Sequence, residues 1–287
     1  MKALSRKIEK SIKPEPVTEG AGVRLNRSIG TDRLDYLDPF LLLDHFASSN
    51  RQDYEAGFPL HPHRGIDTVT YVLRGEVQHK DTLGNSGRIG AGDVQWMTAG
   101  RGIMHEEMPQ VRPEGIAGFQ LWVNLPAKLK MTRPRYQEIR SDEIPEIKKE
   151  DGTKVRVITG TVNGISGPVT GIAANPIYLD VFVPAHTSFM QPIERGHTAF
   201  AYVFDGEAKF AGDEKDDGTM IASPRLVVLG DGDHVQVSTG ATPVRFLLVS
   251  GKPLHEPMAR YGPFVMNTEE EIEQTLLELR QGTFVAT

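Results

Sequence analysis

Short segments rich in β-branched and aromatic residues recur along this chain at roughly ten-residue spacing, and glycine-containing turns separate them. One example is Asp67–Leu73, which is followed by the turn Arg74-Gly75-Glu76 and then by Val77–Asp81. The 29 glycines and 19 prolines also favour many turns and few long helices. This pattern predicts an all-β sandwich or barrel rather than alternating strands and helices.

The length of the chain allows more than one domain. Its 287 residues are enough for one large domain or two ordinary ones. Residues 136–152 form a polar, charged stretch with Pro145, and a second run of strand-like segments follows. We therefore expect an N-terminal domain at residues 1–138 and a C-terminal domain at residues 139–287.

The two halves share a weak internal repeat. In the first half, a strand-like segment is followed by Gly75-Glu76 and later by Gly92-Asp93-Val94-Gln95. The second half has the same order, with Gly206-Glu207 and then Gly232-Asp233-His234-Val235-Gln236. Such a repeat is consistent with duplication of one barrel. The acidic stretch 213–218 is expected to be a solvated hairpin tip, because it lacks the ordered ligand spacing of a calcium loop.

The C-terminal segment is predicted to be a short α-helix. Thr268 and Glu271 fit a capping box at its start, and Gly282 fits its end. Three apolar residues recur on one face at positions i, i+4 and i+7: Ile272, Leu276 and Leu279. We expect this helix to pack on a barrel and to have no catalytic role.

Composition excludes several classes of protein. The formal net charge of −6 gives no global footprint of a nucleic-acid-binding protein. The sequence contains no apolar stretch of about 18 residues that could span a membrane, and its basic N-terminus lacks the apolar core of a signal peptide. We expect the cytoplasm as its location, with the nucleus as the alternative. The absence of cysteine means that any metal must be held by histidines and carboxylates.

Two pairs of ligand-type residues stand out in the first half, His61-Pro62-His63 and His105-Glu106-Glu107. Residues i and i+2 of a β-strand point to the same face, so each pair can present two donors on one strand. If the two strands are neighbours, His61, His63, His105 and Glu107 converge on one point. Three imidazoles and one carboxylate suit a borderline divalent metal.

The alternative for each histidine is a structural role. A lone histidine in a strand is more often structural than ligating, but the second pair and the glycines at 100 and 102, which permit close backbone approach, favour a metal site. The second half lacks such pairs, and three of its histidines are expected to be structural or exposed: His186, His197 and His234. Asp44 and His45 could support the site, but a turn or core-edge role is the favoured interpretation.

Several segments resemble the pirin family of the cupin superfamily. They are His61-Pro62-His63-Arg64-Gly65, Gly92–Ile103, His105-x-Glu107-Met108-Pro109, Gln120–Pro126 and Gly262–Thr268. The resemblance spans the chain nearly end to end, and the first three segments together are highly specific. It implies two cupin barrels in tandem (double-stranded β-helix or jelly-roll barrels), with a metal in the N-terminal barrel only.

The resemblance also implies the ligands and the metal. The ligands would be His61, His63, His105 and Glu107, the same four that the spacing indicates. The metal would typically be one Fe(II) ion, and other divalent transition metals are alternatives. Asp67 stands where many cupins have a glutamate ligand, but it does not ligate in pirin-like proteins. Strand alternation points the neighbouring Glu106 away from the metal.

Two functions follow from the resemblance. One is dioxygenase cleavage of flavonols such as quercetin, with a small aromatic substrate, O2 and Glu107 as the candidate base. The other is a non-catalytic, redox-sensitive, iron-binding regulator that binds a protein partner. The sequence does not decide between these two functions. We expect the dioxygenase, and the regulator is the alternative.

Overall fold

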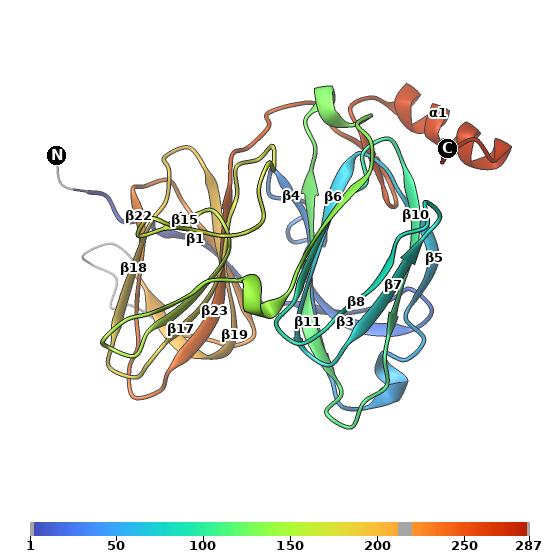
Figure 1. Cartoon of the computed structure of the whole chain (residues 1–287). Coiled ribbons are helices and arrows are strands. Elements are labelled where there is room, and N and C mark those ends of the chain that lie inside the picture. Colours follow the sequence, from blue (N-terminus) through green and yellow to red (C-terminus); the bar gives the residue numbers. More distant parts are fainter. Residues whose placement is uncertain (1–2, 212–219, 286–287) are drawn as a thin grey trace. The chain divides into compact units, whose positions relative to one another are not determined.

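The computed structural model describes residues 3–211 and 220–285, so the acidic stretch 213–218 lies outside the described residues. Within these ranges the chain is built from β-strands, three short 3-10 helices and one α-helix, which confirms the all-β class (Figure 1). No helix among the described residues is long and apolar enough to cross a membrane.

The chain divides into two compact units. The unit that we call the N-terminal barrel contains Glu15–Ser141 and Leu254–Thr287, and the C-terminal barrel contains Met1–Pro14 and Asp142–Pro253. This division differs from the expected single cut near residue 139, because each unit includes a segment from the other end of the chain. The C-terminal helix therefore belongs to the N-terminal barrel.

Two antiparallel sheets form the N-terminal barrel (Figure 1). Among the described residues, the larger one contains, in spatial order, β12 (Arg135–Ile139), β9 (Val94–Thr98), β6 (Ile66–Arg74), β11 (Ile116–Asn124), β4 (Phe40–Ser48), β3 (Val23–Ile29) and β2 (Glu15–Glu19). The smaller one contains β5 (Phe58–His63), β10 (Ile103–Pro109), β7 (Val77–Asp81) and β8 (Ser86–Ile89). These four strands carry both predicted ligand pairs.

The order of strands in the larger sheet explains the composition of its central strands. β6 lies between β9 and β11, and its residues 66–72 are all buried. The β-branched and aromatic side chains of this segment suit a pleated surface that is covered on both faces. Next to it, β11 pairs along nearly its whole length with β4, so the middle of the sheet is a continuous hydrogen-bonded support for the site.

The C-terminal barrel has a comparable plan. Its main sheet runs, in spatial order, β1 (Ile8–Ile12), β21 (Arg225–Leu229), β19 (Thr198–Phe210), β23 (Val244–Gly251), β17 (Ile177–Val183), β14 (Lys154–Thr159) and β13 (Glu146–Lys148). β22 (His234–Ser238) pairs with β18 (Ser188–Pro192) and with the end of β19, and β20 (Ile221–Ala222) also pairs with β19. β15 (Thr161–Val162) and β16 (Ile165–Ser166) form a small hairpin. Valines, leucines and phenylalanines from these strands fill the interior as one cluster.

Two of the repeated glycines have positive φ: Gly75 directly follows β6, and Gly206 lies within β19. Gly75 has φ 84° and Gly206 has φ 71°. A Cβ atom at either position would clash with a backbone carbonyl oxygen, 2.5 Å away at Gly115 and 2.0 Å away at Pro243. Glycine is required where the chain combines positive φ with such close approach, which gives the sequence repeat a structural cause.

Helix α1 (Glu269–Gln281) begins and ends as predicted. Thr268 and Glu271 form the capping box, and Gly282 ends the helix in the left-handed conformation. Ile272 is buried and packs, with Leu276 and Leu279, on the hairpin of β24 (Ala259–Tyr261) and β25 (Phe264–Met266). Among the described residues, the 3-10 helices are Arg51–Asp53, Ala127–Leu129 and Ser141–Glu143.

Candidate metal centre

Antiparallel pairing of β5 with β10 brings the two predicted ligand pairs together. His105 lies directly opposite His61, and Ile103 lies opposite His63. The register shifts between His105 and Glu107, so that Glu107 pairs with Phe58. The two strands are thus neighbours, which is the arrangement that convergence of the donors requires.

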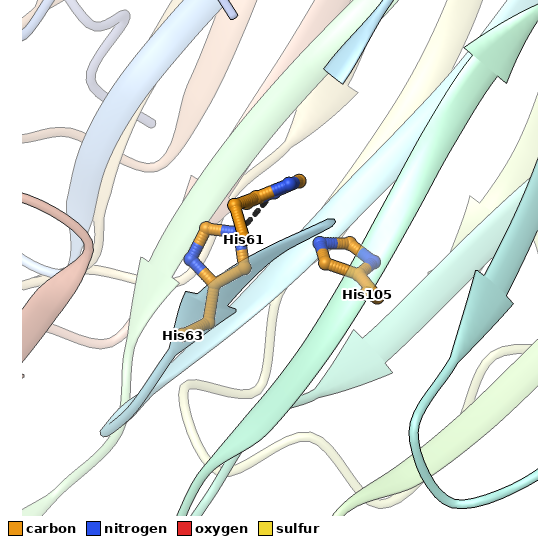
Figure 2. Close-up of side chains that lie close together, drawn as sticks. All are labelled: His61, His63 and His105. Carbon is orange, nitrogen blue, oxygen red and sulfur yellow. Dashed lines mark hydrogen bonds between the residues drawn. The ribbon is translucent and has the colours of Figure 1, made fainter. Parts of the chain in front are cut away.

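The three histidine rings face one another (Figure 2). Their ring centroids are 4.9 Å apart for His61 and His63, 4.5 Å for His61 and His105, and 5.1 Å for His63 and His105. Within the described residues, one ring nitrogen from each lies within 4.8 Å of the other two. The Nε2 atoms of His61 and His63 are 3.1 Å apart. Two nitrogens bound at right angles to one ion at about 2.1 Å would be separated by about 3 Å, so this spacing fits shared coordination.

Hydrogen bonding fixes the tautomer of His61. Its Nδ1 lies 2.9 Å from the carbonyl oxygen of Pro59, and because a carbonyl only accepts, Nδ1 carries the proton and donates it. Its Nε2 then faces the Nε2 of His63, within hydrogen-bond distance. A backbone carbonyl that accepts from the outer nitrogen of a ligating histidine is a common way to orient such a ligand.

His63 and His105 are held in their neutral forms. The two side chains are buried, and burial is the main cause that lowers the pKa of each well below the usual 6.5. The other histidines of the cluster lower both pKa values further, since neighbouring positive charges would repel. Their nitrogen lone pairs are consequently available at neutral pH.

The hydrogen-bond inventory supports a metal as the missing partner. Both ring nitrogens of His105 are buried without a hydrogen-bond partner in the described structure. Buried polar atoms normally have partners, and unpartnered imidazole nitrogens call for an ion or another ligand. The residues present fit a divalent transition metal.

Glu107 lies beside the three-histidine group but is not part of it. In β10, the side chains of Ile103, His105 and Glu107 are buried while those of Met104 and Glu106 are partly exposed, as strand alternation predicts. Thr70 Oγ1 lies 2.8 Å from Glu107 Oε1 and 2.8 Å from Gln120 Oε1. Its single hydroxyl proton can be donated to one of these oxygens at a time. Thr70 therefore restrains the Glu107 carboxylate at the edge of the histidine cluster.

A cavity of about 540 Å³ opens beside the site. His61, His63 and Glu107 line it, and His105 lies behind them, fully buried. Most of its wall is apolar, with contributions from β3, β4, β7 and β11: Val23, Leu25, Leu42, Phe46, Val77, Ile116 and Trp122. The indole of Trp122 packs edge-on against His63, with ring centroids 5.1 Å apart. His61, His63 and Glu107 therefore face a space suited to an apolar or aromatic ligand.

Asp44, which we expected at a turn or core edge, lines this cavity and forms an ion pair with Arg27. His45 stacks on Phe119 outside the lining, and burial lowers its pKa to about 4. Asp67 accepts a hydrogen bond from Trp96 Nε1 at 3.0 Å and is not a member of the histidine group. Burial raises the pKa of Asp67 to about 6, although that hydrogen bond opposes the shift.

Sequence reasoning missed Thr70, Gln120, Trp122 and Arg260 as residues of the site. Thr70 comes from β6, and Gln120 and Trp122 lie two residues apart on β11, so strand alternation hinted that the last two share a face. Arg260 lies more than 150 residues beyond His105 in the sequence and carries no local signal.

Comparisons with known proteins find similarity to pirin proteins over nearly the whole chain. The sequence profile of the Pirin family matches residues 22–123, and that of the Pirin C-terminal cupin domain matches residues 178–285. A pirin-like protein of Caulobacter vibrioides is 45% identical over 280 residues, covering 97% of this chain and 99% of that one. Pirin of Homo sapiens is 44% identical and covers 97% of this chain and 93% of its own.

A solved structure is similar as well. The crystal structure of quercetin 2,3-dioxygenase from Acinetobacter baumannii is 32% identical, with a TM-score of 0.87 over 98% of this chain and 99% of that one. The expected resemblance is thus confirmed in both barrels: the chain belongs to the pirin family and has its tandem cupin fold.

Proposed function

We propose that this protein is a metal-dependent dioxygenase that cleaves flavonols such as quercetin with O2. The observation that carries the proposal is the three-histidine cluster, in which His63 and His105 are buried, beside an apolar cavity of about 540 Å³. Cavities of roughly 300–1,000 Å³ typically hold small organic ligands. The name of the similar Acinetobacter baumannii protein, quercetin 2,3-dioxygenase, supports the same reaction class.

His61, His63, His105 and Glu107 would hold one divalent ion, for which we propose iron(II). This donor set also suits other divalent transition metals. When bound, the ion would supply Lewis acidity and a path for electrons between substrate and dioxygen. Glu106 is excluded from this set because its side chain points to the opposite face of β10 from His105.

Glu107 is the proposed general base. Its carboxylate lines the cavity beside the histidines, where one oxygen can accept the proton of a substrate hydroxyl. The Thr70 hydroxyl donates to the same carboxylate and orients it, and Gln120 offers Thr70 a second acceptor. The apolar wall formed by Leu42, Phe46 and Trp122 would surround the aromatic rings and exclude water from the reacting atoms.

Dioxygen uptake tests this proposal. Protein loaded with Fe(II) should consume O2 in proportion to the quercetin lost, at a rate above that of the same concentration of free iron. The matched His105→Ala variant should fall to the free-iron background, because it removes a buried donor from the cluster. If loaded wild-type protein consumes no O2 with any of several flavonols, the alternative of a non-catalytic, iron-binding regulator with a protein partner replaces the enzyme.

A further inference from the structure

The guanidinium groups of Arg27 and Arg260 both line the cavity, but their partners differ. Arg27 is fully paired: its Nε and Nη2 donate to the two carboxylate oxygens of Asp44 at 2.8 Å each, and its Nη1 donates to Glu19 Oε1 at 2.7 Å. Two carboxylates thus match one cation, so Arg27 has no charge left to offer a ligand.

Arg260 has only weak, neutral partners. Its Nε donates to the carbonyl oxygen of Gly262 at 3.4 Å, and its Nη1 donates to that of Leu41 at 3.3 Å. Among the described residues, no carboxylate forms an ion pair with Arg260, and no acceptor is assigned to its Nη2. Of the two arginines that line the cavity, Arg260 is the one without a direct ion pair among the described residues.

The surroundings of Arg260 make the absence of an ion pair energetically unfavourable. Burial is the main cause that lowers its pKa, and the charge of Arg27 lowers it further, whereas the charges of Asp35 and Asp44 raise it. A partly buried cation without an ion pair gains from any anion that replaces its lost hydration. An anionic ligand in the cavity would supply that partner.

Arg260 is also placed to act on the same ligand as the histidines. Its guanidinium carbon lies 5.5 Å from the centroid of the Trp122 ring, and the same indole contacts His63. Arg260, Trp122 and His63 all line the cavity. A planar aromatic ligand lying along Trp122 could therefore contact the histidine cluster and the Arg260 guanidinium at the same time.

Building on the proposed function, we propose that Arg260 is the anion-binding residue of this cavity, and that the ligand class is a planar aromatic molecule with a negatively charged oxygen. Arg260 would bind that oxygen through Nη2 while the aromatic rings occupy the apolar wall. The residue would select among aromatic ligands by charge and would position the ring relative to the histidines.

Equilibrium binding of a matched pair of probes tests the assignment. The probes are 2-naphthoate and 2-naphthamide, which share size and shape but differ in charge. The affinity of each probe is measured by calorimetry, on metal-free and on Zn(II)-loaded protein. Metal-free wild-type protein should prefer naphthoate by about tenfold, the contribution expected of one charge-assisted hydrogen bond. Arg260→Gln should abolish this preference and leave naphthamide binding within about twofold, while Arg260→Lys should keep part of it.

Arg24→Gln is the matched control, because Arg24 is an exposed arginine outside the cavity that pairs with Asp53. It should retain the wild-type preference. The proposal is overturned if metal-free wild-type protein shows no preference, if Arg260→Gln keeps it, or if both probes weaken equally in Arg260→Gln. Because binding is measured without turnover, an absence of O2 uptake with flavonols would overturn the proposed reaction and leave this assignment standing.

Discussion

At the scale of single residues, the candidate site depends on which of two adjacent carboxylates faces the histidines. Glu106 and Glu107 follow His105 directly, and composition cannot separate them. Strand alternation does: Glu107 is buried on the same face as His105, and Glu106 is partly exposed on the other. Thr70, from the larger sheet, then restrains Glu107 by a hydrogen bond.

This difference gives a prediction for matched variants. Glu107→Gln keeps the size of the side chain and an oxygen donor but removes the base, so quercetin-dependent O2 consumption should fall by about 10²-fold or more while some metal is retained. Glu106→Gln makes the same chemical change on the opposite face and should leave the rate within about threefold. The rate per bound metal ion is the quantity to measure. Equal losses in the two variants would contradict the role given to Glu107.

At the scale of secondary-structure elements, helix α1 is tied to the strand that carries two of the histidines. Arg64 follows His63 directly, and its guanidinium donates to Thr275 Oγ1 at 3.0 Å and to Glu278 Oε2 at 2.6 Å on the helix. Its Nε also donates to the carbonyl oxygen of Arg101. Arg64 is almost fully buried, so these bonds replace its hydration. The helix predicted from its capping pattern thus has a specific docking site next to the strand that carries His61 and His63.

The capping box at the start of α1 should control local opening of the helix. Thr268→Ala removes the oxygen that accepts from the Glu271 backbone N–H and should destabilise the helix by about 1 kcal/mol. Amide hydrogen exchange across residues 269–281 should accelerate by about fivefold, since RT is about 0.6 kcal/mol. Thr268→Ser keeps the oxygen and should exchange at nearly the wild-type rate. Unchanged exchange in Thr268→Ala would mean that tertiary packing alone holds the helix start.

At the scale of the whole molecule, one chain forms two barrels of similar plan, and the ligand pairs occur in the first. The segment of the C-terminal barrel that corresponds to the first ligand pair reads Phe189-Met190-Gln191-Pro192. Phe189 is buried in the apolar cluster of that barrel. The equivalent strand is thus used there for packing.

This division of roles predicts the metal content. Wild-type protein should bind about one divalent ion per chain, and His61→Ala combined with His105→Ala should abolish stoichiometric binding, because half of the four donors are lost. Replacing His186, His197 and His234 together by Gln should leave the content unchanged. Metal analysis of protein reloaded after chelation is the measurement. Loss of half or more of the metal in the triple variant would show that the C-terminal barrel contributes ligands.

The sequence by itself determined the features that depend on local pattern. Strand periodicity and glycine turns predicted the all-β class, the capping residues predicted α1, and the i, i+2 spacing predicted which donors share a strand face. These succeed because side-chain direction in a strand and cap chemistry in a helix are set by the nearest few residues. Family resemblance added the tandem cupin fold, which periodicity alone could not specify.

Only the tertiary structure decided the features that depend on distant contacts. The exchange of terminal segments between the units places α1 with the N-terminal barrel, because Arg64 and the hairpin of β24 and β25 provide its docking surface. The cavity likewise joins β3, β4, β6 and β10 with Arg260, which lies far away in the chain. Local patterns specify the strands and which side chains share a face. Packing of the whole barrel determines which faces meet, and it therefore also determines the surroundings of the three histidines.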